Sequence, residues 1–139
     1  MTVHDFKRFP ELTNSQMRMF YFDSPHKQIN EDFFATVIKV TDGDTIRVEV
    51  DFRDFNFPVR FLDTDAPEMD TRAGRNTQKW LENLILNKEV EVFINSNNRV
   101  DKWGRLLGEI FFQGMNINKL SMLEGRAVKF GNAPTTPFE

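Results

Sequence analysis

Short runs of β-branched and aromatic residues in the middle of the chain constrain the fold more than any other feature of the sequence. FFATVIKV (33–40) and DTIRVEVDF (44–52) have strand composition, and Asp42-Gly43 between them is typical of a tight hairpin turn. A third run of the same kind, FPVRFLD, follows at 57–63. These spacings predict three consecutive antiparallel strands joined by short connections.

The second half of the chain alternates between helical and strand patterns. NTQKWLENLIL (76–86) carries an apolar stripe that includes Leu81 and Ile85, which predicts a helix. The other expected elements are strands over 89–94 and 105–112, a helix over 116–125 with Ile117, Leu120 and Leu123 on its apolar face, and an extended piece over 126–130. This order indicates a mainly β, α+β fold: a closed, antiparallel, five-stranded OB-type barrel with two or three attached helices.

Composition limits the class of protein. A chain of 139 residues suits one domain, and 40% hydrophobic with 28% charged residues is typical of a soluble globular protein. No run is long and apolar enough for a membrane span, the N-terminal residues contain no apolar signal region, and no cysteine is present. We therefore expect no membrane partner and no thiolate metal site. The location is not fixed by these features, and the cytoplasm is favoured.

The net charge of −3 argues against a protein that holds nucleic acid through its overall field. The charges are unevenly distributed, since residues 33–68 contain four Lys or Arg and eight Asp or Glu, whereas residues 69–130 contain ten and seven. This asymmetry is consistent with a cation site beside an anion site, and equally with ordinary surface scatter.

Three polar stretches carry the candidate chemistry: TDGDT (41–45), RFLDTDAPE (60–68) and DKWGR (101–105). Singly, they are explained as a hairpin turn, a helix-capping loop and a turn with an exposed arginine. Together they place Asp44 and Asp65 at strand ends, where a barrel would bring both to one rim. Two carboxylates with a backbone carbonyl and waters suit Ca²⁺. A zinc-type site is disfavoured because there is no cysteine and both histidines precede the first strand.

Arg60 and Arg105 carry guanidinium groups, whose planar forks match phosphate oxygens. A hard cation, two arginines and a spare carboxylate are the parts required for metal-assisted attack of water on a phosphodiester. The residues therefore favour phosphodiester hydrolysis, with Arg60 serving the phosphate instead of pairing with its acidic neighbours.

ATVIKVTDGDTIRV, VRFLDTDAPE, DKWGR and EGRAV resemble, in this order and at compatible spacing, the motifs of the staphylococcal nuclease (thermonuclease) family. The resemblance covers about residues 33–130 and implies an OB barrel with attached helices. The chain then divides into an extension with a short helix (1–32), the nuclease-like domain (33–130) and a C-terminal tail (131–139). The implied activity is Ca²⁺-dependent endonucleolytic hydrolysis of DNA and RNA that leaves 3′-phosphates, with nucleic acid as the partner.

The resemblance also implies a metal site and a group that acts on water. Asp44 and Asp65 match the carboxylates that bind Ca²⁺, and the backbone carbonyl of Ala66 matches the group that completes the site. Glu68 matches the carboxylate that acts on the attacking water, as general base or by orienting it.

The arginines and their neighbours match the family's phosphate-binding positions. Arg60 and Arg105 match the two arginines that hold the scissile phosphate. Lys102 and Trp103 are candidates to contact a phosphate and a sugar or base, although Trp103 has the alternative of folding onto the barrel. Asn118 falls on a position that we interpret as a buried structural amide.

The chain departs from the family pattern at two positions. Family members often have threonine where Ala66 stands, which matters little because the liganding group is the carbonyl. Asp63 replaces a small or apolar residue, and it either tightens a cation site or faces water. Strict strand alternation would put Arg60 and Asp65 on opposite faces, so we expect a bend or bulge before Ala66.

Two alternatives to an enzyme stay open. Domains of this family in larger eukaryotic proteins keep the barrel as a binding module without catalysis, and residues 1–32 suggest a docking arm for a protein partner. Retention of the full charged set favours the nuclease, because clustered carboxylates cost stability when nothing uses them. We expect residues 1–32, with apolar side chains that include Leu12, Met17 and Phe20, to pack on the barrel as structural cover, ahead of the docking arm.

Overall fold

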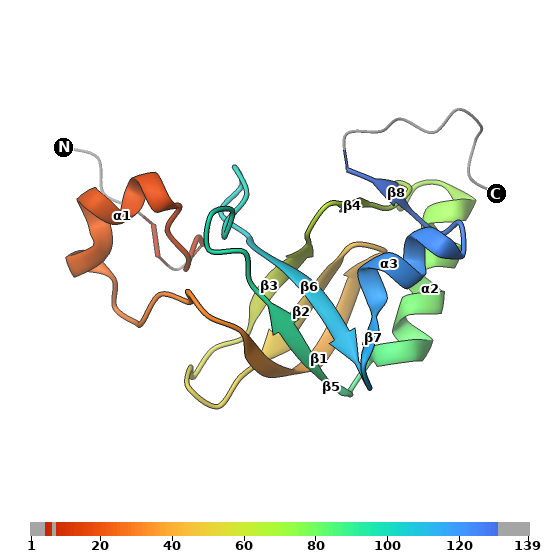
Figure 1. The fold of residues 1–139 in the computed structure, drawn as a ribbon, viewed down its shortest axis with the longest axis horizontal. Helices are drawn as coiled ribbons and strands as arrows, with labels where there is room; N and C mark the ends of the chain where they lie inside the picture. The colour runs from red at the N-terminus through yellow and green to blue at the C-terminus, as the bar shows by residue number, and fades with distance from the viewer. Residues whose placement is uncertain (1–4, 7, 131–139) are drawn as a thin grey trace.

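The computed structural model describes residues 5, 6 and 8–130, and its centre is a closed barrel of five strands (Figure 1). The strands are β1 (Phe33–Asp42), β2 (Thr45–Glu49), β3 (Phe57–Phe61), β5 (Glu89–Phe93) and β6 (Leu106–Phe112). β1 pairs with β2 and β5, β2 pairs with β3, and β5 pairs with β6, all antiparallel. A parallel pairing of β3 with β6 closes the barrel, so the expected OB-type fold is confirmed but the barrel is mixed instead of wholly antiparallel.

The apolar core lies inside the barrel. Because successive side chains of a strand point to opposite faces, one row from each strand enters this core. β1 alternates between buried and exposed residues from Phe33 to Val37. The largest fully buried side chains of the five strands are Phe57, Phe61, Ile46, Leu106 and Ile110. Burial of such side chains contributes about 1.5–3 kcal/mol each, which is the main stabilisation of a barrel of this size.

Two helices cover one end of the barrel (Figure 1). α2 (Arg72–Ile85) begins four residues before the expected start, and the side chain of its N-cap residue, Thr71, accepts a hydrogen bond from the Gly74 N–H. α3 (Ile117–Leu123) buries Ile117 as expected, but Leu123 is 84% exposed, so its expected place on the apolar face is wrong. Six residues correspond to well over one and a half helical turns, which carries Leu123 away from the face of Ile117.

Three two-residue strands complete the sheets. β7 (Met115–Asn116) extends the barrel sheet beside β6. β4 (Thr64–Asp65) pairs antiparallel with β8 (Val128–Lys129), which lies inside the extended piece expected over 126–130. This pairing ties the stretch that follows β3 to the chain after α3.

The N-terminal residues contain α1 (Asn14–Phe20) and a short 3₁₀ helix, η1 (Tyr21–Asp23), at the opposite end of the barrel from α2 (Figure 1). α1 and η1 bury none of their own residues. The buried residues of this part lie on either side of the helices: Pro10, Glu11, Leu12, Gln28 and Ile29. Cover of the barrel by residues 1–32 and the three-part division of the chain stay predictions, and the tail 131–139 lies outside the described residues.

Among the described residues, no helix has both the length and the apolar character that crossing a membrane requires.

Candidate active site

Asp44 lies in the turn between β1 and β2, and its neighbour Gly43 packs against helix α2. Its backbone N–H donates a 3.0 Å hydrogen bond to Oδ1 of Asp42, which is therefore the turn residue expected. A Cβ on Gly43 would lie 2.5 Å from Cγ2 of Thr77 and 2.8 Å from Cβ of Ala66. Glycine at this position lets the turn approach both the helix and the segment at residue 66, and this close packing places Asp44.

The guanidinium of Arg60, on β3, joins Asp44 to Asp65. Its Nη2 lies 3.3 Å from Oδ2 of Asp44 and 3.3 Å from Oδ1 of Asp65. Its Nη1 donates hydrogen bonds to the carbonyls of Phe61, at 2.8 Å, and Thr64, at 2.5 Å. The two acids therefore meet as expected. The expectation that Arg60 does not pair with its acidic neighbours is wrong, because this guanidinium forms an ion pair with each of them.

Burial raises the pKa of Asp44 to about 7. Loss of hydration is the largest cause, and the hydrogen bond and negative charge of Asp42 act in the same direction. The charge of Arg60 and the N–H of Ala66, 2.8 Å from Oδ2, act in the opposite direction. One guanidinium does not offset the carboxylates around it, so the site favours a proton or a further positive charge.

Asp63 forms the bend between Arg60 and Asp65. Its φ is 56°, in the left-handed region that aspartate adopts more readily than most residues. The bend confirms the expected departure from strict alternation. The Asp63 side chain is exposed and its carbonyl accepts a 2.9 Å hydrogen bond from the N–H of Phe130. Asp63 is therefore a turn residue that faces solvent.

Asn118 holds the chain immediately before this bend. Its Nδ2 donates to the carbonyls of Leu62, at 3.0 Å, and Gly108, at 3.2 Å. Its Oδ1 accepts a 3.0 Å hydrogen bond from the N–H of Ile110. Asn118 is 2% exposed, so its interpretation as a buried structural amide is confirmed.

Glu68 lies in the connection between β4 and α2, which is fixed through its backbone. The Glu68 carbonyl accepts hydrogen bonds from the N–H and the hydroxyl of Thr71, at 3.0 and 2.6 Å. A Cβ on Gly74 would lie 1.9 Å from that carbonyl oxygen, so glycine is required for the helix to pack here. The Glu68 side chain is exposed, and among the described residues it makes no hydrogen bond or ion pair. The structure does not bring its carboxylate into contact with either arginine.

Arg105 is held by Asp101, a residue that the sequence analysis did not single out. The Nε of Arg105 donates to Oδ2 of Asp101 at 2.8 Å, and the backbone N–H groups of Trp103 and Arg105 both donate to Oδ1 at 2.9 Å. The signal was the position of the aspartate at the head of DKWGR, where its side chain caps the following turn.

Arg60 and Arg105 line one open cleft of about 550 Å³, together with Lys102, Trp103 and Phe130. Trp103 is 62% exposed, so the alternative that it folds onto the barrel is wrong. The Nζ of Lys102 lies 5.2 Å from the centre of the Trp103 ring. Phe130, also absent from the expected residues, has its ring centre 5.9 Å from Cζ of Arg60. The cleft wall therefore carries basic and aromatic side chains together with Asp63 and Asp101, and Arg60 connects it to Asp44 and Asp65.

The donor set beside Arg60 is compatible with a hard cation. Oδ2 of Asp44 and Oδ1 of Asp65 lie at equal distances, 3.3 Å, from one positively charged nitrogen, so a single cationic centre already bridges them. Carboxylate oxygens are the ligands that Ca²⁺ prefers. No three acidic or histidine side chains of the described residues form a complete metal cluster. A cation at this position would therefore take its remaining ligands from backbone carbonyls and water.

Comparison with known proteins agrees with this site. Residues 58–136 match the family described as "Staphylococcal nuclease homologue". The chain is 34% identical over 105 residues to "Micrococcal nuclease" of Shigella flexneri, an alignment that covers 69% of this chain and 58% of that protein. It is 33% identical over 107 residues to "Uncharacterized endonuclease" of Escherichia coli O157:H7, covering 76% and 67% respectively. The chain thus spans roughly three fifths to two thirds of these relatives. On the family match and these identities, the chain belongs to the staphylococcal nuclease family.

Proposed function

We propose that this chain is a Ca²⁺-dependent nuclease that hydrolyses phosphodiester bonds of DNA and RNA and leaves 3′-phosphates. The observation that carries the proposal is the double position of Arg60, which pairs with Asp44 and Asp65 and also lines the cleft with Arg105. One side chain thereby connects a hard-oxygen site to a cleft that suits an anion. Similarity to a named micrococcal nuclease and to endonucleases supports the same activity.

Asp44, Asp65 and the backbone carbonyl of Ala66 would hold the cation, with water as the remaining ligands. When bound, such a cation polarises a phosphate oxygen and makes a neighbouring water more acidic. The raised pKa of Asp44 is consistent with a place for this added charge.

Arg60 and Arg105 bind the phosphate and stabilise the charge that develops on its oxygens in the transition state. Asp101 fixes the Nε edge of Arg105 at 2.8 Å, so this guanidinium is oriented before substrate arrives. Preorganised donors of this kind typically contribute about 3–4 kcal/mol each to transition-state stabilisation. Lys102 and Trp103 contact the neighbouring phosphate and base, and stacking on an aromatic ring does not discriminate between bases.

Glu68 acts on the attacking water, as general base or by orienting it. Its side chain is exposed and carries no competing partner among the described residues, so the carboxylate is available to a water molecule. In this role a carboxylate takes a proton from the water as its oxygen attacks phosphorus.

The test is a cleavage assay on single-stranded DNA, duplex DNA and RNA, with Ca²⁺ and then with chelator. We expect chelator-sensitive cleavage of at least one substrate and 3′-phosphate ends on the products. Arg105→Ala and Glu68→Gln should each lower kcat by about 10²–10³. Arg47→Ala and Glu89→Gln are the matched controls, because each makes the same change on a barrel strand and neither residue lines the cleft.

No chelator-sensitive cleavage of any substrate would overturn the proposal. Nucleic-acid binding without cleavage would instead support an inactive binding module. Full activity in Arg105→Ala or Glu68→Gln would contradict the role assigned to that residue.

A further inference from the structure

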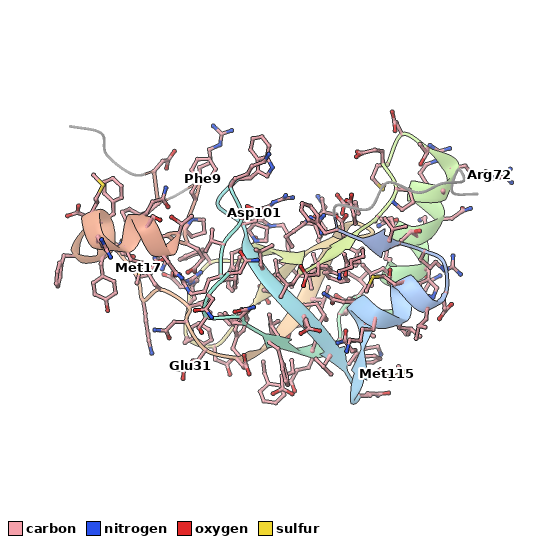
Figure 2. All side chains as sticks on the ribbon, turned by 45° about the horizontal axis from the view of Figure 1, so that its top comes forward. Phe9, Met17, Glu31, Arg72, Asp101 and Met115 are labelled. Carbon is pink, nitrogen blue, oxygen red and sulfur yellow. The ribbon has the colours of Figure 1, made fainter. Side chains whose placement is uncertain are left out.

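Residues 95–105, in the connection between β5 and β6, include Lys102, Trp103 and Arg105, and we call them the cleft loop. Residues 8–14, which precede and begin α1, contact the cleft loop at its base and at its tip, and we call them the N-terminal segment. The two pieces of chain are about 90 residues apart in sequence. Figure 2 shows Phe9 of the N-terminal segment beside Asp101 of the cleft loop.

At the base, the guanidinium of Arg99 is enclosed by the N-terminal part of the chain. It donates hydrogen bonds to the carbonyls of Leu12, at 2.9 Å, and Ile29, at 2.7 Å, and to Oδ1 of Asn14, at 3.3 Å. It also forms an ion pair with Glu11 at 3.3 Å. Arg99 is 4% exposed, so these contacts replace its hydration almost completely.

Glu11 fixes the N-terminal segment in return. Its side chain is 1% exposed and lies 2.6 Å from Nη2 of Arg53 and 3.3 Å from Nη2 of Arg99. Its Oε2 accepts a 3.0 Å hydrogen bond from the N–H of Ile29. A buried carboxylate is stable only where such partners surround it, so displacing the segment would break these interactions.

At the tip, Phe9 packs against Gly104. A Cβ on Gly104 would lie 2.5 Å from Cδ1 and 3.0 Å from Cβ of Phe9, so the phenylalanine occupies the space that a side chain would need. Gly104 also has φ +81°, a conformation that favours glycine. The turn that carries Trp103 and Arg105 is thus covered on one side by Phe9.

The two contacts bracket the group that holds Arg105. The carbonyl of Arg99 accepts a 2.8 Å hydrogen bond from Leu107 on β6, and Asp101 follows two residues later. Asp101 binds Nε of Arg105 and the N–H groups of Trp103 and Arg105. A shift of the loop at either end would therefore move Asp101 and, with it, the guanidinium of Arg105.

We propose that Phe9 and Glu11 are positioning residues that hold the cleft loop so that Arg105 faces the cleft in the orientation that cleavage requires. The inference rests on the proposed nuclease function and adds to it a part of the chain that precedes the barrel. Phe22 of η1 is 97% exposed, so contact with the loop distinguishes Phe9 from the exposed aromatic residues of the same region.

Phe9→Ala is the main test variant, because it removes the tip contact without breaking the buried ion pairs. A Trp80→Phe background leaves Trp103 as the single tryptophan and serves as the reference. We expect the amide hydrogens of Trp103 and Arg105 to exchange about tenfold faster, since they report local opening of the loop. The fluorescence anisotropy of Trp103 should fall in the same variant.

In the cleavage assay Phe9→Ala should lower kcat about tenfold, with a smaller change in KM, because Arg105 acts on charge that develops in the transition state. Phe9→Leu, which keeps an apolar contact with Gly104, should recover most of the loss. Phe22→Ala is the matched control and should change neither the loop nor kcat.

Unchanged amide exchange and Trp103 anisotropy in Phe9→Ala would overturn the inference, and so would a loosened loop with unchanged kcat. The loop measurements need no cleavage. If the reference protein cleaves no substrate, the proposed function is contradicted. If Phe9→Ala nevertheless speeds amide exchange in the cleft loop, the structural half of the inference still stands.

Discussion

Two clusters of arginine and carboxylate among the described residues can be compared, and their charge balance is opposite. The sealed cluster, Glu11 with Arg53 and Arg99, has one carboxylate and two guanidinium groups. The open cluster, Asp44 and Asp65 with Arg60, has two carboxylates and one guanidinium group, and Arg60 reaches the cleft.

The two clusters differ in whether neighbouring groups compensate their surplus charge. In the sealed cluster the arginines also donate to the carbonyls of Lys27, Leu12 and Ile29, so backbone dipoles disperse the surplus positive charge. In the open cluster the surplus negative charge remains, and the pKa of Asp44 rises to about 7. The first arrangement holds chain segments together, whereas the second favours the arrival of another cation.

The largest expected effect is on the sealed cluster. Glu11→Gln leaves two buried guanidinium groups without their carboxylate and should lower the free energy of unfolding by about 3–5 kcal/mol, measured by urea denaturation. Glu31→Gln is the control, because its carboxylate is 79% exposed and 4.0 Å from Lys27, and it should change stability by less than about 0.5 kcal/mol. A Glu11→Gln protein as stable as the control would show that the sealed cluster does not hold the segment.

The next effect is a pH dependence of stability that the open cluster causes in the metal-free protein. Because the folded pKa of Asp44, about 7, exceeds its ordinary value of 3.8, the folded state binds the extra proton between these values. Its contribution to stability is complete below pH 3.8 and is lost as the pH rises to about 7.

Asp44→Asn should remove this loss of stability at high pH, because its amide resembles the protonated carboxyl group. With chelator present, its free energy of unfolding should equal that of the parent near pH 4 and exceed it by about 2–4 kcal/mol above pH 7. Urea denaturation across this range measures the difference. A difference in the free energy of unfolding that does not vary with pH would mean that Asp44 is not the carboxyl group whose pKa is raised in the cluster.

The smallest effect concerns the bend that brings Asp65 to Arg60. Asp63→Val places a β-branched residue at φ 56° and should cost about 1–2 kcal/mol, whereas Asp63→Asn should stay within about 0.5 kcal/mol of the parent. Thermal unfolding of both variants measures this. A destabilised Asp63→Asn protein would indicate that the charge of Asp63, and not its backbone conformation, is what the open cluster uses.

The sequence predicted the parts that have a local pattern. The β-branched runs became β1, β2 and β3, and the stripe with Leu81 and Ile85 became α2, because burial on one face repeats with the period of each element. The proximity of Asp44 and Asp65 was also predictable, since both residues lie at strand ends and a barrel brings such ends to one rim.

The sealed cluster was not predictable in this way. Glu11 lies in a polar stretch that indicates exposure, and its burial depends on arginines 42 and 88 residues away. The pairing of Arg60 with both acids was missed for a related reason, because it depends on the left-handed bend at Asp63. Two-residue strands such as β4 and β8 are too short to leave a pattern.

We expect the open cluster, and not the sealed one, to take a cation. The most direct measurement is the thermal unfolding of the parent, Asp44→Asn and Glu31→Gln proteins over a series of Ca²⁺ concentrations at constant ionic strength and pH 8. The free energy of unfolding of the parent and of Glu31→Gln should rise with the logarithm of the Ca²⁺ concentration, and that of Asp44→Asn should not. No Ca²⁺-dependent stabilisation of the parent, or the same stabilisation in Asp44→Asn, would contradict this expectation.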